Sequence, residues 1–348
     1  MKLLKPLKKY LQVLIKFDYK IIFVFSDPAG GNIISSLIDR ALEEKKDPGI
    51  HFKVYSDLKG IIDKSYEKYI LRISNNISKI TNEINNFDPN EIFTTTSTNN
   101  FEHNWRKVAR IKKIHVKSFV DHWTGIRERF NFKEQEIFPD TIYLINNKAR
   151  KIAIEEGIDK NIIRVKENPY YDKIRNFKPN YTKGNFFSKL KINNEKKIIL
   201  YISDDIKNKT LFNSLGFDEY SVLKDILNSL KSLMVSNKLN LGSYVFLIKL
   251  HPRSKLNKYS SYDKLFKLIN LEYRVIKDFD PLTINYFSDF VLGMFSNMVI
   301  ESYLMNKKLL RIQTGIKIDD PLGFENLNNN CIERIENLNS NLFKLLSS

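Results

Sequence analysis

The chain has 348 residues, a length that corresponds to about two domains. Hydrophobic residues make up 42% of it and charged residues 28%, which is enough apolar material for true hydrophobic cores and excludes the disordered, collagen-like and low-complexity classes. The single cysteine, Cys331, excludes a disulfide framework and a cysteine-based zinc cluster, and it fits a reducing compartment.

Positive charge is the strongest feature of the composition. Lysine and arginine number 57 against 40 aspartate and glutamate residues, a formal net charge of +17. Such an excess of positive charge favours an acidic partner. Three classes of partner compete: nucleic acid, an anionic membrane surface, and a phosphorylated or acidic substrate. The lysines are scattered and no signature of an RNA- or DNA-binding module is present, so we expect no nucleic acid among the partners.

Residues 1–18 predict a short basic amphipathic helix, because leucines recur at helical spacing with lysines between them. Two interpretations stay open: the helix lies on an anionic membrane, or it packs on its own domain. The segment has no small-residue cleavage site, and no run approaches the roughly 18 apolar residues that span a bilayer. We expect a cytoplasmic protein, with peripheral contact at the inner face of the cytoplasmic membrane under the first interpretation.

Residues 19–175 predict a first Rossmann-like domain. It opens with an apolar strand at 20–25, a turn that contains Gly30 and Gly31, and an apolar-periodic helix at 33–42, the first unit of a doubly wound sheet. Further strands are predicted at 51–55, 91–95, 114–120, 141–145 and 162–165, and helices in 66–87, 104–111 and 148–156.

A polar, basic segment at 176–196 is interpreted as a linker, after which the same alternation returns over 197–348. Strands of this second Rossmann-like domain are predicted at 197–202, 244–250, 273–276, 290–292 and 308–312, and helices at 220–236, from 281 and at 298–305. The predicted fold class is α/β, with two doubly wound domains that face a cleft. Because ligands bind at the carboxyl ends of parallel strands, residues just after strands are the candidates for chemistry.

His251 directly follows the strand at 244–250, with Lys249, Pro252 and Arg253 beside it. A histidine with cationic neighbours at a strand's carboxyl end can donate hydrogen bonds to a phosphate. The alternative is a histidine that only ends the strand.

Ser296 and Asn297 stand between a strand and an apolar helix, where their side chains and the free N–H groups of the helix start form an anion site. An ordinary N-cap is the alternative, because both residue types are preferred there. Asp204 and Asp205 follow the strand at 197–202, where they either contact a ribose or a base or cap a turn. They lack further acidic neighbours, so we expect no metal site.

These motifs resemble those of a known group of enzymes. Lys249-Leu250-His251-Pro252 and Ser296-Asn297 resemble the His-Pro and Ser-Ser/Ser-Thr motifs of bacterial sialyltransferases and polysialyltransferases, which Kdo transferases and CDP-glycerol glycerophosphotransferases share. The segment 164–172 resembles the Gly-Asn-Pro-x-x-Asp segment that ends the first domain of that group. Two positions depart from the pattern: Glu167 replaces a glycine, and Asn297 replaces a second hydroxyl residue.

The resemblance implies a metal-independent enzyme of the GT-B type, in which His251 and Ser296 hold the phosphate of a nucleotide-activated sugar. A CMP-activated acidic sugar, sialic-acid-like or Kdo, is the first choice of donor. It implies no cofactor beyond that donor.

The first domain then has to hold the acceptor and supply a base for its hydroxyl group. Asp121, directly after the strand at 114–120, is preferred over Asp27, which follows the first strand; either acid is alternatively a cap or a turn residue. Gly30 and Gly31 let the backbone approach a ligand closely. Trp123, Arg127 and Arg129 follow Asp121, and an aromatic ring with two guanidinium groups suits the binding of an acidic sugar. An equal alternative is that this segment is only a solvated basic helix face.

The predicted function is an inverting, metal-independent glycosyltransferase that moves an acidic sugar from a CMP-activated donor to a surface glycan or glycolipid. An anionic acceptor held at the membrane accounts for the positive charge. The alternatives are a CDP-glycerol-type polyol-phosphate transferase, a sugar-nucleotide 2-epimerase, and a basic protein that only binds nucleic acid or glycan. The epimerase requires acidic and histidine residues in both domains.

Overall fold

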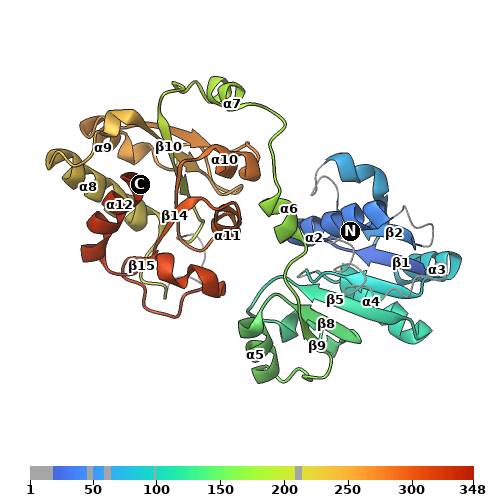
Figure 1. Cartoon of the computed structure of the whole chain (residues 1–348). Coiled ribbons are helices and arrows are strands. Elements are labelled where there is room, and N and C mark those ends of the chain that lie inside the picture. The colour runs from blue at the N-terminus through green and yellow to red at the C-terminus, as the bar shows by residue number, and fades with distance from the viewer. Residues whose placement is uncertain (1–18, 45–49, 59–63, 98, 208–213) are drawn as a thin grey trace. The chain divides into compact units, whose positions relative to one another are not determined.

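The structure is a computed structural model that describes residues 19–44, 50–58, 64–97, 99–207 and 214–348 (Figure 1). The predicted helix at 1–18 and its membrane contact lie outside the described residues. The chain forms two compact units, residues 1–173 (unit 1) and 174–348 (unit 2). Over the described ranges, no helix combines the length and the apolar character that a membrane crossing requires.

Unit 1 is built on a seven-stranded sheet in which every strand pair is parallel, in the order β3-β2-β1-β4-β5-β8-β9. Its strands are β1 (Tyr19–Val24), β2 (Ile50–Ser56), β3 (Ile70–Arg72), β4 (Glu91–Thr94), β5 (His115–Val120), β8 (Thr141–Leu144) and β9 (Ile163–Val165). Its helices are α2 (Pro28–Glu44), α3 (Ile77–Phe87), α4 (Phe101–Lys112) and α5 (Asn147–Glu155), and α6 (Tyr170–Arg175) crosses the boundary to unit 2. A small antiparallel hairpin joins β6 (Asn131–Phe132) to β7 (Gln135–Glu136).

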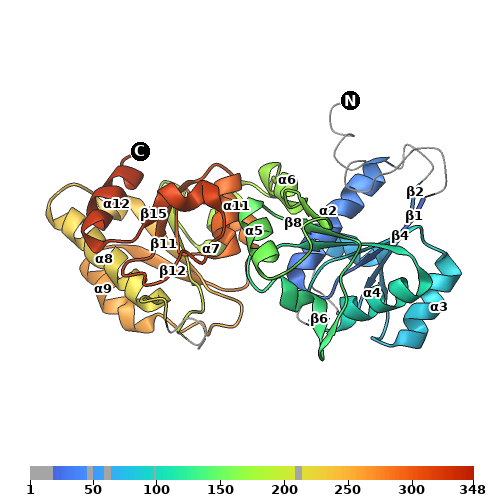
Figure 2. The same cartoon turned by 90° about the horizontal axis from the view of Figure 1, so that it is seen from below.

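The central strands of unit 1 are buried along most of their length because helices cover both faces of the sheet (Figure 2). Residues 21–24 of β1 and Phe25, which follows the strand, are fully buried. On one face, Ile80 and Ile84 of α3 and Trp105 of α4 pack against Ile22 and Ile92 of the sheet. Burial of these side chains accounts for the stability of both helices on the sheet.

Unit 2 repeats the arrangement with a parallel six-stranded sheet in the order β12-β11-β10-β13-β14-β15. Its strands are β10 (Lys197–Ile202), β11 (Tyr244–Lys249), β12 (Glu272–Ile276), β13 (Phe290–Gly293), β14 (Lys308–Ile312) and β15 (Cys331–Ile332). Its helices are α7 (Lys183–Leu190), α8 (Glu219–Val235), α9 (Asp263–Leu268), α10 (Pro281–Phe287), α11 (Asn297–Leu304) and α12 (Leu338–Leu346).

The segment at 176–196, interpreted from sequence as a linker, contains helix α7 of unit 2. Phe186 and Phe187 of this helix are fully buried. The ring of Phe186 lies 4.9 Å from that of Phe287 in α10 and 5.3 Å from that of Phe279. Two adjacent phenylalanines among polar and basic residues are a weak sequence signal, which explains why this docking helix reads as a linker.

The predicted fold class, α/β with two Rossmann-like doubly wound domains, is confirmed. In both sheets the chain winds outward from a central strand and then reverses, between β1 and β4 in unit 1 and between β10 and β13 in unit 2. Strands β3 and β15 were not predicted, and β3 lies in a stretch expected to be helical. Each has only two or three residues at a sheet edge, too few to show a periodicity. The predicted common cleft stays a prediction.

Candidate functional site

The reversal of strand order in unit 2 brings the loops after β10, β11 and β13 together at the carboxyl end of the sheet. The N–H group of Ser203, after β10, donates to the backbone oxygen of Lys249 at 3.0 Å. The N–H group of Phe295, after β13, donates to Oδ2 of Asp204 at 3.5 Å. Ligands bind at such a reversal in open α/β sheets, so these loops form the candidate site of unit 2.

His251 lies in this site, one residue beyond Leu250 at the end of β11. Its Nδ1 atom accepts a hydrogen bond from the N–H group of Arg253 at 3.2 Å, and the side chain is partly exposed. Because Nδ1 accepts, the proton of the neutral ring resides on Nε2. In this tautomer Nε2 is the ring atom that carries the proton, and the predicted hydrogen bond from His251 to a phosphate stays a prediction.

The neighbours of His251 divide into a buried and an exposed cation. Lys249 is buried, its Nζ atom donates to the backbone oxygens of Leu250 and Lys277 at 3.3 and 2.7 Å, and burial lowers its pKa. This lysine holds the loops after β11 and β12 together. Arg253 and Pro252 are exposed, and the guanidinium of Arg253 pairs with the Asp205 carboxylate at 3.4 Å.

Ser296 is the N-cap of α11, and its Oγ accepts the N–H group of Met298 at 3.4 Å. The cap interpretation is thus realised: Ser296 accepts the N–H group of Met298 through Oγ and that of Val299 through its backbone oxygen, at 2.9 Å. An anion at this position would meet the N–H group of Asn297 and the positive end of the helix. The turn is tight: a Cβ atom at Gly293 would lie 2.6 Å from Cγ2 of Val299. The fully buried side chain of Arg311 also holds this turn, since its Nε atom donates to the backbone oxygen of Met294 at 2.9 Å.

The corresponding reversal in unit 1 lies between β1 and β4. Asp27 caps α2 there, and its Oδ1 accepts the N–H group of Gly30 at 2.6 Å. A Cβ atom at Gly30 would lie 2.3 Å from Oγ1 of Thr95, which directly follows β4. Gly30 therefore permits a close approach of two protein segments, and the predicted approach of Gly30 and Gly31 to a ligand stays a prediction.

A buried group of hydroxyls surrounds one carboxylate beside Asp27. Oε2 of Glu102, the second residue of α4, accepts from Oγ of Ser26 at 2.6 Å and from Oγ of Ser97 at 2.5 Å. The two hydroxyls are themselves 2.6 Å apart. This carboxylate is 1% exposed, and its charge contributes to raising the pKa of Asp27.

The two candidate bases lie close enough to influence each other. Burial and, to a smaller extent, the charge of Asp121 raise the pKa of Asp27 to about 6, against the opposing effect of the N–H group of Gly30. Burial also raises the pKa of Asp121, which follows β5, and Arg129 opposes that shift. The structure therefore brings together two of the carboxylates that the sequence selected, with pKa values displaced toward neutral pH.

His122 and Trp123 form a stacked pair next to Asp121, with ring centroids 4.9 Å apart and an interplanar angle of 19°. Burial and the cation of Arg129 lower the pKa of His122 to about 4, so its ring is neutral at pH 7. Trp123 is only 6% exposed. The stacking surface predicted for a sugar is therefore covered on one face by His122.

Of the two arginines in this segment, Arg129 is the one at the strand ends. Its Nη1 atom donates to the backbone oxygen of Thr96, after β4, at 3.1 Å. Arg127 is exposed, and its guanidinium pairs with Glu136 at 2.6 Å and bonds to the backbone oxygen of Glu156 at 3.0 Å. Sequence alone does not separate two arginines that are two positions apart.

Five residues in or next to these loops are not selected by the sequence analysis: Glu102, His122, Glu219, Lys258 and Arg311. Glu102 and Glu219 stand in the first turn of a helix, where acids are ordinarily exposed, and Lys258 stands in a lysine-rich stretch. Only His122, next to Asp121 after a strand, carried a readable signal. No cluster of three or more potential metal ligands occurs among the residues that the structure describes.

Comparison with known proteins shows the fold. No protein-family model and no curated protein matches the chain. The solved structure of UDP-GlcNAc 2-epimerase from Neisseria meningitidis, bound to UDP-GlcNAc, is similar with a TM-score of 0.69 and 15% identity over 94% of this chain and 91% of that chain. A glycosyltransferase from Rickettsia africae has a TM-score of 0.63 and 15% identity over 95% and 88%. Anabaena HepE in complex with UDP-glucose has a TM-score of 0.61 and 12% identity over 94% and 90%.

The chain therefore has the GT-B-like fold of two Rossmann-like domains, the class in which these epimerases and glycosyltransferases are built. The narrower resemblance to sialyltransferases and Kdo transferases stays a prediction.

Proposed function

We propose that the chain is an enzyme that acts on a nucleotide sugar and holds the nucleotide's phosphates on unit 2. One observation carries the proposal: Nε2 of His251 and the start of α11 both lie on loops at the reversal of the second sheet. A histidine N–H group, together with the N–H group of Asn297 at the positive end of a helix, is suited to phosphate oxygens. The similar structures bound to UDP-GlcNAc and UDP-glucose favour a uridine diphosphate sugar over a CMP-sugar.

The first candidate reaction is epimerisation at carbon 2 of the sugar. Inversion at carbon 2 requires that one proton is removed and that another is returned on the opposite face. A carboxyl group with a pKa of about 6, such as Asp27, is present in both protonation states near neutral pH and suits such exchange. Acidic and histidine side chains occur at the strand ends of both units, as this reaction requires: Asp27, Asp121 and His122 in unit 1, Asp204 and His251 in unit 2.

Glycosyl transfer is the second candidate, favoured by the placement of the His251-Pro252 and Ser296-Asn297 motifs on the two loops that flank the loop after β10. In this reaction Asp121 is the base for the acceptor hydroxyl. A CMP-activated acidic sugar and an anionic glycan or glycolipid fit the net charge of +17. Polyol-phosphate transfer from a CDP-linked substrate would use the same hydrogen-bond donors to bind the phosphates.

The test has two steps. A thermal-shift and calorimetric panel of UDP, CMP, CDP and GDP identifies the nucleotide, because a bound nucleotide stabilises the fold by mass action. The protein is then incubated with UDP-GlcNAc in deuterium oxide and the sugar is followed by NMR. Deuterium at carbon 2 supports epimerisation, whereas selective binding of CMP without deuterium uptake supports the transferase. Binding of no nucleotide overturns the proposal.

A further inference from the structure

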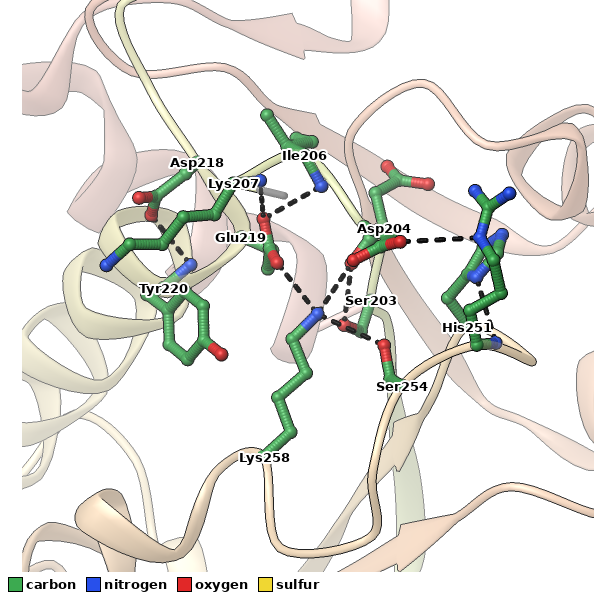
Figure 3. Close-up of polar contacts among 12 residues, drawn as sticks. Ser203, Asp204, Ile206, Lys207, Asp218, Glu219, Tyr220, His251, Ser254 and Lys258 are labelled. Carbon is green, nitrogen blue, oxygen red and sulfur yellow. Dashed lines mark hydrogen bonds and ion pairs between the residues drawn. The ribbon is translucent and has the colours of Figure 1, made fainter. Parts of the chain in front are cut away.

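Lys258 is a buried lysine that joins three segments of unit 2 (Figure 3). Its side chain is 5% exposed and its Nζ atom pairs with Oε1 of Glu219 at 2.7 Å. The same atom donates to the backbone oxygen of Asp204 at 3.0 Å and to Oγ of Ser254 at 3.3 Å. One ammonium group therefore connects the loop after β10, the start of α8 and the turn after β11.

Glu219 completes this connection from the other side. It is the first residue of α8, and its side chain is fully buried. Its Oε2 atom accepts the N–H groups of Ile206 and Lys207, both at 3.1 Å. The charge of the carboxylate is thus balanced by the ammonium group and by the positive end of the helix, and two backbone amides bind its Oε2 atom.

The segments that this ion pair joins carry the candidate phosphate-binding residues. Asp204 belongs to the loop after β10. Ser254 lies in the same turn as His251, because its N–H group donates to the backbone oxygen of His251 at 2.9 Å. Displacement of either segment would move the imidazole relative to the other loops of the site.

Stability alone does not account for such a pair. The cost of desolvating two charges offsets most of their attraction, and replacement by neutral residues of similar size is often close to neutral for folding. The ion pair instead selects one arrangement of the loops, because Oε2 of Glu219 also accepts two backbone amides and Nζ of Lys258 also donates two hydrogen bonds, which have directional requirements.

We propose that the Lys258–Glu219 ion pair is a positioning device, which holds the loops after β10 and β11 in the arrangement that binds the nucleotide's phosphates. The inference rests on the proposed function for the identity of the ligand. Lys258 and Glu219 do not themselves contact the phosphates in this proposal. They affect the affinity for the nucleotide through His251 and its loop, and they are therefore positioning residues.

The test uses the full chain with the double substitution Lys258→Met and Glu219→Gln. Glutamine retains an oxygen acceptor for the amides of Ile206 and Lys207, while both charges are removed. We expect a melting temperature close to that of the wild type, faster amide hydrogen exchange in 203–207 and 251–254 together, and UDP affinity weaker by at least about tenfold.

Unit 1 offers a matched control, the buried pair of Lys117 and Glu91, whose side chains are 3% and 2% exposed. Lys117→Met with Glu91→Gln removes an equivalent buried charge pair from the other unit. It should leave UDP affinity and exchange in unit 2 unchanged. If the first double variant does not fold, Ser254→Ala, which removes only the hydrogen bond to the turn, carries the test with faster exchange in 251–254 and weaker binding.

Unchanged exchange in both loops overturns the inference, whatever the protein binds. Faster exchange with unchanged UDP affinity overturns it as well, because the loops would then move without consequence for the ligand. If the wild type binds no nucleotide, the proposed function fails, and the exchange measurement alone decides whether the pair fixes the loops.

Discussion

A Cβ atom at Gly30 would lie 2.3 Å from Oγ1 of Thr95 and 3.0 Å from its Cβ atom, so only a glycine lets the first turn of α2 approach the end of β4 this closely. The approach aligns the cap of α2 with the loop that bears Ser97 and Thr96. It thereby sets the surroundings of Asp27, whose carboxylate binds the amide of Gly30.

Gly30→Ala is expected to destabilise the protein. The added methyl group must displace Thr95 or Asp27, and such overpacking costs about 1–3 kcal/mol. Urea unfolding gives the change in the free energy of unfolding. Gly184→Ala is the matched control, because the nearest atom to its added Cβ is 3.9 Å away and the position is helical. Equal losses in both variants would show that the contact between α2 and β4 has no special role.

His251→Ala is expected to weaken UDP binding by roughly tenfold, since it removes one donor to the phosphates at a cost of about 1.5 kcal/mol. Folding should hardly change, because the side chain is partly exposed. Calorimetric titration with UDP measures the effect. His51→Ala, at an exposed position of β2 in unit 1, is the control and should bind UDP as the wild type does. If the His251→Ala variant binds UDP as tightly as the wild type, His251 has no role in binding and only ends a strand.

The architecture could be predicted from the sequence because its signal is carried by long, fully buried strands. Runs such as 20–25, 197–202 and 244–250 are apolar at almost every position, which is typical of parallel strands covered on both faces. Short edge strands such as β15 have no such pattern, and they take their place only through pairing with a neighbour that is already fixed.

The site could be predicted only in part, for a related reason. Position after a strand selected Asp27, Asp121, His251 and Ser296, and the structure places all four at strand ends. What surrounds them depends on contacts between residues distant in sequence, such as Lys258 with Asp204 or Glu102 with Ser26. A lysine among lysines shows no sign that it is buried, because burial results from packing and not from composition.

Asp27→Asn is expected to stabilise the protein at neutral pH. Burial raises the pKa of Asp27 to about 6, so the folded protein retains a proton there that the unfolded chain releases above about pH 4. Stability is therefore lost as the pH rises from about 4 through 6, and the wild type is the less stable protein above that range. Asparagine still accepts the hydrogen bond from Gly30 and carries no charge.

The expected gain is about 1–2 kcal/mol at pH 8, after a discount for partial exposure, and none below pH 4. Urea unfolding of both proteins from pH 4 to 8 measures it. Asp159→Asn, at an exposed turn of unit 1, is the control and should give the same small difference at each pH. A difference for Asp27→Asn that does not vary with pH would contradict the raised pKa.

Asp121→Asn separates the two candidate bases. It retains size and hydrogen bonding but cannot accept a proton, so turnover should fall by roughly two orders of magnitude or more, in the range of a lost general base. UDP affinity should stay within about twofold, because Asp121 belongs to unit 1 and the proposed phosphate donors belong to unit 2. Turnover and calorimetric titration of the same preparation give both quantities.

Under epimerisation both Asp121→Asn and Asp27→Asn should abolish deuterium uptake at carbon 2, since removal and return of the proton need two positions. Under glycosyl transfer only one of them should be inactive. An active Asp121→Asn beside an inactive Asp27→Asn would move the base to the loop after β1, and full activity in both variants would leave unit 1 without a role in the proton transfer.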